Sequence, residues 1–324
     1  MKDPGGSSGV FNLVDHGTEN RTRRGPIGFV LLLAALAVPA FARAGAVPSP
    51  GSDPPPPARR IVSLAPNITE MLFAIGAGSQ VVGVTNYCDY PPEARTRPKV
   101  GGFVNPNPEA VLALAPDLIV ATPNVGNRSF VEHMMRAGAR VEIVEARNLE
   151  EIFPALDALG RVSGHREEAA AVSTRLHEAV ASVRRRVGAL PRPAAVICIQ
   201  RDPLIVAGPG SYPHDLLLLA GGRSIVPDSA GAYPALSMER VIAAAPEVII
   251  QTRMDAASGA GDSENIRRWW SRWPSLPAVL RDRVHVVDGD TILRPGPRVA
   301  LGLEMLVGLL HPETRTDRDR RAGP

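Results

Sequence analysis

Cysteine, lysine and aromatic residues are all scarce in this sequence of 324 residues. Two cysteines cannot build the several disulfides that hold small secreted domains together. The fold therefore depends on a hydrophobic core, for which 44% of hydrophobic residues is sufficient. Lys2 and Lys99 are the only lysines, and the 36 basic residues are nearly balanced by 33 acidic ones. Because no basic stripe is interleaved with aromatic residues, we expect no nucleic-acid partner.

The motifs of common metal and nucleotide sites are absent as well. The sequence has no HExxH, no CxxC, no phosphate-binding loop and no pair of histidines at the helical i, i+4 spacing. Such motifs supply the ligands and bases of many metalloenzymes. We therefore expect no catalytic residues, no metal ligands and no resident cofactor.

The N-terminal segment has the pattern of a secretory signal. Three arginines at residues 21–24 precede an apolar run at residues 27–41, which ends in small residues and is too short to span a membrane comfortably. We assign residues 1–44 to a signal peptide and residues 45–59, which contain four consecutive prolines, to an extended linker. The leader predicts export to a periplasmic compartment; an uncleaved anchor is the alternative.

An internal repeat organises the rest of the chain. Residues 107–122 read NPEAVLALAPDLIVAT, and residues 237–252 read SMERVIAAAPEVIIQT. In each copy an amphipathic run ends before a proline, and a short apolar run follows, which predicts a helix, a tight turn and a strand. The chain therefore contains two similar α/β units.

Further strands flank each copy of the repeat, and strands that alternate with helices favour parallel sheets. The predicted fold class is α/β, with parallel-sheet lobes at residues 60–149 and 193–312. Connecting helices are expected at residues 150–192, and residues 313–324 are expected to form a disordered tail. The apolar, β-branched runs that predict these strands lie at residues 60–64, 81–85, 141–144, 194–199, 204–207 and 284–287.

The connecting segment contains one long amphipathic stretch, at residues 165–189. A helix of this length spans about 36 Å at 1.5 Å per residue, enough to bridge two lobes as a stiff rod. Cys88 and Cys198 fall in different lobes in this scheme, so we expect both thiols to be unbridged.

The succession of several short motifs resembles a known family, the periplasmic cobalamin-binding proteins of ABC importers, which belong to the helical-backbone metal-receptor class. The resemblance implies two lobes joined by one rigid helix, a ligand held in the cleft between them and little hinge motion. Cobalamin or a related corrinoid is the implied ligand. The motifs are RIVSLAPNITE at residues 60–70, VGVTNYCDYPPE at 82–93, VGGF at 100–103, NPE at 107–109, LLLLAGG at 216–222 and PGPR at 295–298.

By this resemblance, Tyr87, Phe103 and Tyr233 line the cleft, because a flat corrin ring fringed with amides suits aromatic walls with polar tips. The alternative is that each ring fills a loop. Thr122 takes another cleft-facing position, where a small residue replaces an expected aromatic one. Arg294 is expected to face the ligand.

Other cations leave the ligand class open. Arg298 is expected to be structural, tying its loop to the lobe. Arg128 and Arg201 fall in predicted loops after strands, where they would suit the carboxylates of an iron siderophore or of haem. A receptor for such a chelate, or an exported α/β enzyme that binds a metallocofactor, is therefore the alternative function.

Glu109 and Glu239 occupy equivalent positions of the repeat. The resemblance implies that they dock on arginines of the two membrane subunits of the importer, one per lobe. The alternative is that each acid only favours the start of its helix through the helix dipole. The receptor is expected to be a monomer.

Overall fold

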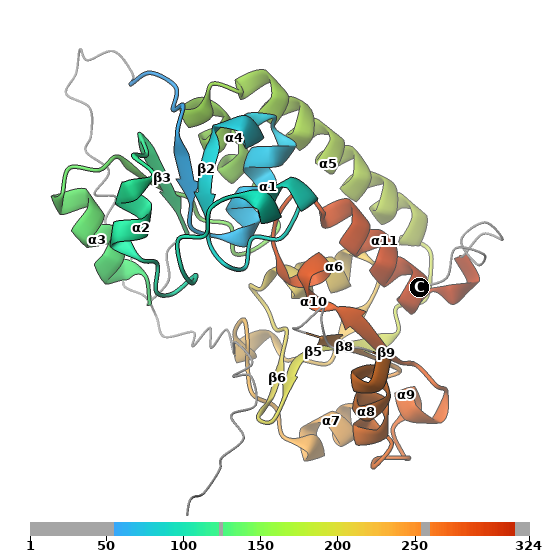
Figure 1. Ribbon diagram of the computed structural model, residues 1–324. Coiled ribbons are helices and arrows are strands. Elements are labelled where there is room, and N and C mark those ends of the chain that lie inside the picture. Colours follow the sequence, from blue (N-terminus) through green and yellow to red (C-terminus); the bar gives the residue numbers. More distant parts are fainter. Residues whose placement is uncertain (1–54, 123–125, 254–259, 315–324) are drawn as a thin grey trace, which may run out of the picture.

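A parallel, four-stranded sheet forms the centre of the first lobe (Figure 1). The computed structural model describes residues 55–122, 126–253 and 260–314. The strand order is β2-β1-β3-β4, and all neighbouring strands are parallel. The elements of this lobe are β1 (Ile61–Ser63), α1 (Pro66–Ala74), η1 (Ala77–Gln80), β2 (Val81–Val84), η2 (Pro92–Thr96), α2 (Pro108–Ala113), β3 (Leu118–Ala121), α3 (Arg128–Arg136) and β4 (Val141–Ile143).

The second lobe is built on a sheet of order β6-β5-β8-β9, with β7 paired to β5. Its parallel core confirms the predicted α/β architecture. The elements are β5 (Ala194–Arg201), β6 (Leu204–Val206), α6 (Tyr212–Leu219), β7 (Arg223–Ser224), η3 (Asp228–Ala230), α7 (Met238–Ala244), β8 (Val248–Arg253), α8 (Ala260–Trp270), α9 (Pro277–Leu280), β9 (Val284–Asp288), α10 (Gly289–Leu293), α11 (Val299–Leu310) and η4 (Pro312–Thr314).

One strand departs from the predicted parallel arrangement. β6 runs antiparallel to β5, because only Asp202 and Pro203 connect the two strands. A parallel neighbour needs a crossover of a dozen or more residues, whereas two residues can form only a hairpin. β5 also extends to Arg201, two residues beyond the predicted end of that strand.

Alternate strand residues of the first lobe contribute to different hydrophobic clusters, as the two-residue period of a strand requires. Ile61, Leu118 and Val120 face one cluster, whereas Val62 and Ile119 face a second cluster on the outer side of the sheet. All five side chains are buried. Both faces of this sheet are therefore covered, which explains why the strands read as continuous apolar runs.

The second lobe repeats this pattern and shares a core with the first. Ile197, Val248 and Ile250 belong to the same cluster as the inner face of the first sheet, and Val196 and Ile249 face an outer cluster. One hydrophobic cluster runs through both lobes. Separating the lobes would therefore expose apolar surface to water, at a free-energy cost of about 25 cal/mol for each Å². The shared core thus holds the lobes in a fixed relation.

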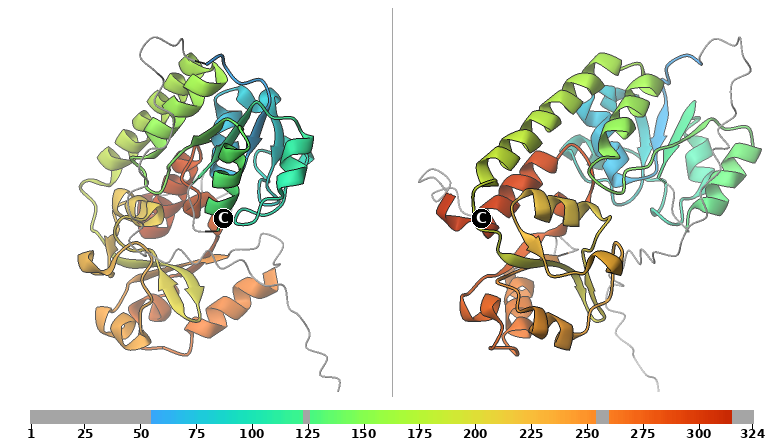
Figure 2. Two further views of the ribbon diagram at one scale, coloured as in Figure 1. Left: turned by 90° about the vertical axis from the view of Figure 1, so that its left-hand side faces the viewer. Right: turned by 180° about the vertical axis from the view of Figure 1, so that it is seen from behind.

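Two helices connect the lobes (Figure 2). α4 (Ile152–Ser163) and α5 (Arg166–Val187) are separated by Gly164, which has a left-handed backbone with φ of 81°. α5 contains 22 residues and spans about 33 Å. Figure 2 shows it running from one lobe to the other with α11 packed along it. This helix is the predicted connecting rod, three residues shorter than expected.

The two copies of the repeat make the same contact with the first strand of their own sheet. Asp117 accepts hydrogen bonds from the backbone N–H groups of Arg59 and Arg60 at 2.8 and 3.0 Å. Glu247 accepts one from the N–H of Ala194 at 3.0 Å. The carboxylate between helix and strand therefore fixes the start of β1 in one lobe and of β5 in the other.

The proposed segment boundaries are partly covered by the structure. The signal peptide, residues 1–44, lies outside the described residues. Ala58, at the end of the linker, is buried and donates a hydrogen bond to the carbonyl of Val162 at 2.8 Å. Residues 313 and 314, assigned to the tail, belong to η4. Within the described ranges, no helix is both long and apolar enough to cross a membrane.

Both cysteines are buried and unbridged, Cys88 in the first lobe and Cys198 on β5 of the second, as predicted. Burial raises the pKa of each thiol. We expect Ellman's reagent to react slowly with the native protein and to detect two thiols after denaturation without a reductant. Loss of both thiols in the denatured monomer would contradict this arrangement.

Candidate functional site

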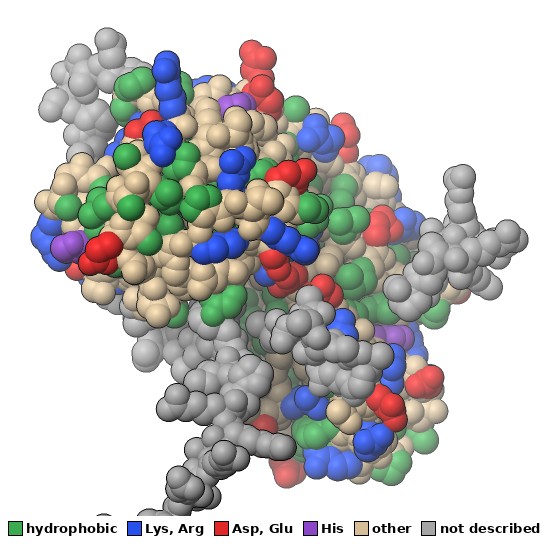
Figure 3. All heavy atoms as spheres, viewed as in Figure 1, with side chains coloured by type: hydrophobic (Ala, Val, Ile, Leu, Met, Phe, Trp, Pro, Cys, Tyr) green, Lys and Arg blue, Asp and Glu red, His purple; other side chains and the backbone are tan. Residues whose placement is uncertain are grey.

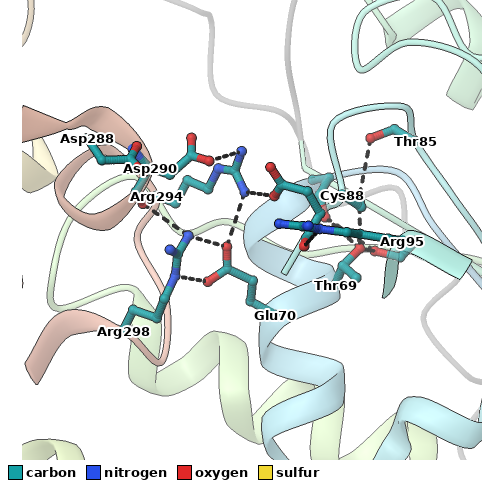
Figure 4. Close-up of polar contacts among 12 residues, drawn as sticks. Thr69, Glu70, Thr85, Cys88, Arg95, Asp288, Asp290, Arg294 and Arg298 are labelled. Carbon is teal, nitrogen blue, oxygen red and sulfur yellow. Dashed lines mark hydrogen bonds and ion pairs between the residues drawn. The ribbon is translucent and has the colours of Figure 1, made fainter. Parts of the chain in front are cut away.

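A buried ion pair joins the two lobes at the centre of the molecule (Figure 4). Glu70, on α1 of the first lobe, has a side chain that is only 1% exposed. Arg298, at the start of α11 in the second lobe, donates to it from Nε at 2.7 Å and from Nη2 at 2.6 Å. Such a bidentate pair fixes the distance and the orientation of the two groups.

Arg294 extends this pair into a larger network. Its Nη1 atom lies 3.4 Å from a Glu70 oxygen and 2.6 Å from an oxygen of Asp89, which belongs to the first lobe. Its Nη2 atom lies 2.7 Å from Asp290, one helical turn earlier on α10. We call the five residues Glu70, Asp89, Asp290, Arg294 and Arg298 the interlobe cluster. Three of its contacts cross between the lobes.

The local sequence explains how the two arginines reach the first lobe. Asp288 caps α10 by accepting from the backbone N–H of Asp290 at 3.0 Å. Two prolines flank Gly296 between α10 and α11 and restrict the backbone of this loop. A Cβ atom at Gly296 would lie 3.8 Å from the carbonyl oxygen of Asn67 on α1. The loop therefore passes close to the helix that carries Glu70.

Burial changes the titration of the acids in the interlobe cluster. Desolvation raises the pKa of Glu70, although Arg298 and Arg294 act in the opposite direction. Desolvation also raises the pKa of Asp290 to about 6, again against the effect of Arg294. Both acids are therefore easier to protonate than exposed carboxylates, while their arginine partners retain the charge.

Two of the predicted ligand residues lie on neighbouring loops of the first lobe. The loop with Tyr87 follows β2, and the loop with Phe103 precedes α2. The N–H of Asn86 donates to the carbonyl of Gly101 at 2.9 Å, and a Cβ at Gly102 would lie 4.0 Å from the Tyr87 ring. The structure thus brings these two loops together. Tyr87 is 39% exposed, and Phe103 is half-buried against the shared core.

Thr122 follows β3, and its hydroxyl is buried without a hydrogen-bond partner among the residues that the structure describes. Tyr233 is half-buried in the loop before α7. Burial raises the pKa of its hydroxyl to about 12, with a smaller contribution from the charge of Asp215. Asp215 in turn accepts from the N–H of Leu149 at 3.2 Å, close to the start of the connecting helices.

The remaining candidates have different surroundings. The guanidinium group of Arg298 lies 4.5 Å from the centre of the Tyr90 ring, so Tyr90 belongs to the edge of the interlobe cluster. Tyr212 is fully buried. Arg128 is the first residue of α3 and pairs with Glu132 at 2.9 Å. Arg201 is the last residue of β5. The sequence analysis placed Arg128 and Arg201 in loops after strands. That prediction was wrong for both residues, which belong to α3 and β5.

Three acids of the interlobe cluster were missed by the sequence analysis. Glu70 had a detectable signal, because it is a single charge within an otherwise apolar helical run, and a buried carboxylate requires a cation. Asp89 and Asp290 had no such signal, since acids in loops and at helix starts are common. Figure 3 shows acidic side chains near the junction of the two lobes. Across residues 55–122, 126–253 and 260–314, no group of three or more His, Cys, Asp or Glu side chains is arranged to hold a metal ion.

Glu109 and Glu239 lie in the first turns of α2 and α7 and are exposed. Asn107 and Ser237 cap these helices: each side-chain oxygen accepts from the backbone N–H three residues later, at 2.9 and 3.3 Å. Hydrogen bonds from its own N–H and from Ser237 lower the pKa of Glu239. The two acids are thus presented to solvent by equivalent, capped helices.

Comparison with known proteins identifies a clear set of relatives. Residues 61–291 match the sequence profile of a family described as periplasmic binding protein. A vitamin B12-binding protein of Vibrio cholerae is 30% identical over 253 residues, which cover 78% of this chain and 89% of that protein. The vitamin B12-binding protein of Salmonella paratyphi A is 31% identical over 253 residues, covering 78% of this chain and 90% of the relative.

Solved structures share the fold. The crystal structure of the periplasmic vitamin B12-binding protein BtuF of Vibrio cholerae matches with a TM-score of 0.70 and 28% identity, covering 81% of this chain and 100% of that one. A periplasmic heme-binding protein from Pseudomonas aeruginosa matches with a TM-score of 0.73 and 25% identity, covering 80% and 94%. Two ligand classes therefore occur on this architecture.

The buried ion pair should contribute strongly to stability. Replacing Arg298→Met leaves the Glu70 carboxylate in a buried position with only the longer contact to Arg294. We expect the free energy of unfolding in urea to fall by about 3 to 5 kcal/mol. Adding Glu70→Leu to this variant should recover part of the loss, because no unpaired charge remains.

The exposed pair between Arg268 and Glu264 provides the control. Its side chains are 68% and 74% exposed, and its distance is 2.8 Å. Glu264→Gln should change the stability by less than about 1 kcal/mol. Equal effects of Arg298→Met and Glu264→Gln would show that burial adds nothing to the interlobe pair.

Proposed function

Because the chain belongs to the periplasmic binding protein family, we propose that it captures cobalamin or a related corrinoid and delivers it to an ABC importer. The observation that carries the proposal is the similarity to vitamin B12-binding proteins over about nine-tenths of their length. The family match, at residues 61–291, includes the sheets of both lobes and the connecting helices. The proposed role is binding and delivery, without a catalytic step.

The proposed ligand site lies between the lobes, beside the interlobe cluster. Tyr87, Phe103 and Tyr233 provide aromatic walls, Thr122 a small polar contact and Arg294 a hydrogen-bond donor. Aromatic side chains with polar tips suit the flat, amide-fringed surface of a corrin. Such a ligand carries its own metal, so the protein needs no metal ligand. The proximity of the Tyr87 and Phe103 loops supports a continuous wall on the first lobe.

Haem is the second candidate ligand. It is favoured by the structural similarity to the heme-binding protein from Pseudomonas aeruginosa, which has the same fold at 25% identity. An iron siderophore would use the same region. These chelates carry carboxylates or other anions, so they differ from cobalamin in the charge that the site must accept.

Delivery requires a partner for the outer surfaces of the lobes. We propose that Glu109 and Glu239 each pair with an arginine of one membrane subunit of the importer. The exposed aliphatic residues Leu112 and Ile242, one turn after the two acids, support this role: they are 50% and 40% exposed at equivalent positions of the repeat. A receptor with two similar docking helices suits a permease built from two similar subunits. We further propose that the protein is exported through its N-terminal signal and acts as a monomer.

Cobalamin binding can be tested by titration calorimetry with cyanocobalamin. We expect one ligand per chain, and Phe103→Ala and Tyr233→Ala should each weaken binding by about 1 to 3 kcal/mol, the scale of burying an aromatic side chain. Phe73→Ala is a matched control, because Phe73 packs at the end of α1 beside Arg97, outside the proposed site. Absence of cobalamin binding together with tight uptake of haem or a siderophore would overturn the proposed ligand.

Docking can be separated from ligand binding with the double variant Glu109→Ala and Glu239→Ala. We expect nearly unchanged cobalamin affinity but weaker association with the permease and slower receptor-dependent uptake, since both acids are exposed on helices away from the interlobe cluster. Each single variant should have a smaller effect. Normal uptake by the double variant, or a loss of ligand affinity that accounts for the loss of uptake, would assign both acids to helix stability.

A further inference from the structure

Both arginines of the interlobe cluster are already paired with carboxylates of the protein. Arg294 contacts Asp89 at 2.6 Å and Asp290 at 2.7 Å, with Glu70 at 3.4 Å, and Arg298 is engaged by Glu70. The side chain of Arg294 is only 16% exposed. Its positive charge is therefore balanced by carboxylates before any ligand arrives.

The interlobe cluster holds three carboxylates and two arginines, and the surrounding charges offset this difference. Arg95 donates from Nε to the backbone carbonyl of Asp89 at 2.9 Å, and Lys99 donates to the carbonyl of Cys88 at 2.9 Å. Asp288 adds a further carboxylate beside Asp290. Together with the interlobe cluster, these groups comprise as many carboxylates as cations. A ligand that enters this region thus meets a polar but electrically balanced wall.

An anionic ligand and a neutral ligand face different conditions at this wall. To pair with Arg294, a carboxylate of the ligand must compete with Asp89 and Asp290, which remain within a few ångströms as like charges. An amide carbonyl can instead accept a hydrogen bond from one of the remaining guanidinium N–H groups without displacing either acid. An amide N–H can also donate to the exposed oxygens of these carboxylates.

We infer that Asp89 and Asp290 are specificity-determining residues, which reject anionic metal chelates such as haem and favour a neutral ligand fringed with amides. The inference rests on the proposed function, because it assumes that ligand binds beside Arg294. It explains how a cleft that contains two arginines selects against the carboxylates that arginine usually binds. Asp89 is the more exposed of the two acids, with a side chain that is 42% exposed. It therefore has the more direct contact with an incoming ligand.

The test compares the affinities for cyanocobalamin and haemin at pH 8, where the carboxylates are ionised. Each ligand is titrated into the wild-type protein, Asp89→Asn and Asp290→Asn, with thermal melting to check folding. We expect the wild-type protein to prefer cyanocobalamin. In each variant the ratio of the two affinities should move toward haemin by on the order of tenfold, because one repelling charge has been removed while the shape of the side chain is kept.

Glu264→Gln is the matched control, since it removes one negative charge from an exposed position on α8 outside the interlobe cluster. Its affinity ratio should equal that of the wild-type protein. An unchanged ratio in both aspartate variants, or an equal shift in Glu264→Gln, overturns the inference even if cobalamin binds. A wild-type protein that binds cyanocobalamin but prefers haemin also overturns it.

The haemin titration distinguishes failure of the inference from failure of the proposed function. If the wild-type protein does not bind cyanocobalamin, the proposed ligand is wrong. Haemin affinity must still rise in Asp89→Asn and Asp290→Asn, but not in Glu264→Gln, if the two acids select against anions. No gain in haemin affinity in either aspartate variant contradicts the inference independently of cobalamin.

Discussion

A carboxylate that is almost completely buried between two lobes constrains the whole structure. Glu70 loses its hydration on folding, and only a close cation compensates for that loss. The compensating group, Arg298, belongs to the other lobe, so satisfying one side chain requires both lobes to take a defined relative position. The same contact places the loop between α10 and α11 against α1 and thereby brings Arg294 to Asp89. The geometry of the proposed ligand site follows from this pairing.

The repeat explains why the two lobes present similar features on different sequences. Ala115 and Ala245, at the ends of α2 and α7, both have a left-handed backbone, with φ of 43° and 46°. The helices are capped in the same way, and Asp117 and Glu247 hold the first strand of their sheets. A conformation that is unfavourable for alanine is kept in both copies because the helix must turn directly into the strand. The similarity of the surfaces around α2 and α7 is thus a consequence of the repeated fold. The two proposed docking positions, Glu109 and Glu239, lie on these similar surfaces.

The sequence predicted the architecture better than the site. The two sheets and the connecting helix were predicted from short-range signals. These were the hydrophobic period, the proline between helix and strand, and the repetition of that pattern in the second lobe. The reversal of β6 was also encoded locally, in the two-residue connection after Arg201, but it was overlooked. The interlobe cluster was not local: Glu70 and Arg298 are 228 residues apart. Glu70 was missed although it is a single charge in an apolar helical run, and such a signal does not tell which of the many arginines in this chain is its partner.

The fixed relation of the lobes determines how the site can discriminate between ligands. A receptor with a flexible hinge can adjust the distance between its lobes to each ligand, whereas here a shared hydrophobic core, α5 and the Glu70–Arg298 pair all resist such a change. Recognition must then depend on side chains that can rearrange without moving the lobes. Asp89 meets this condition, because it is partly exposed and lies on a loop, while Glu70 does not. Stability and selectivity are therefore assigned to different acids around the same two arginines, so selectivity can change without loss of the interlobe pair.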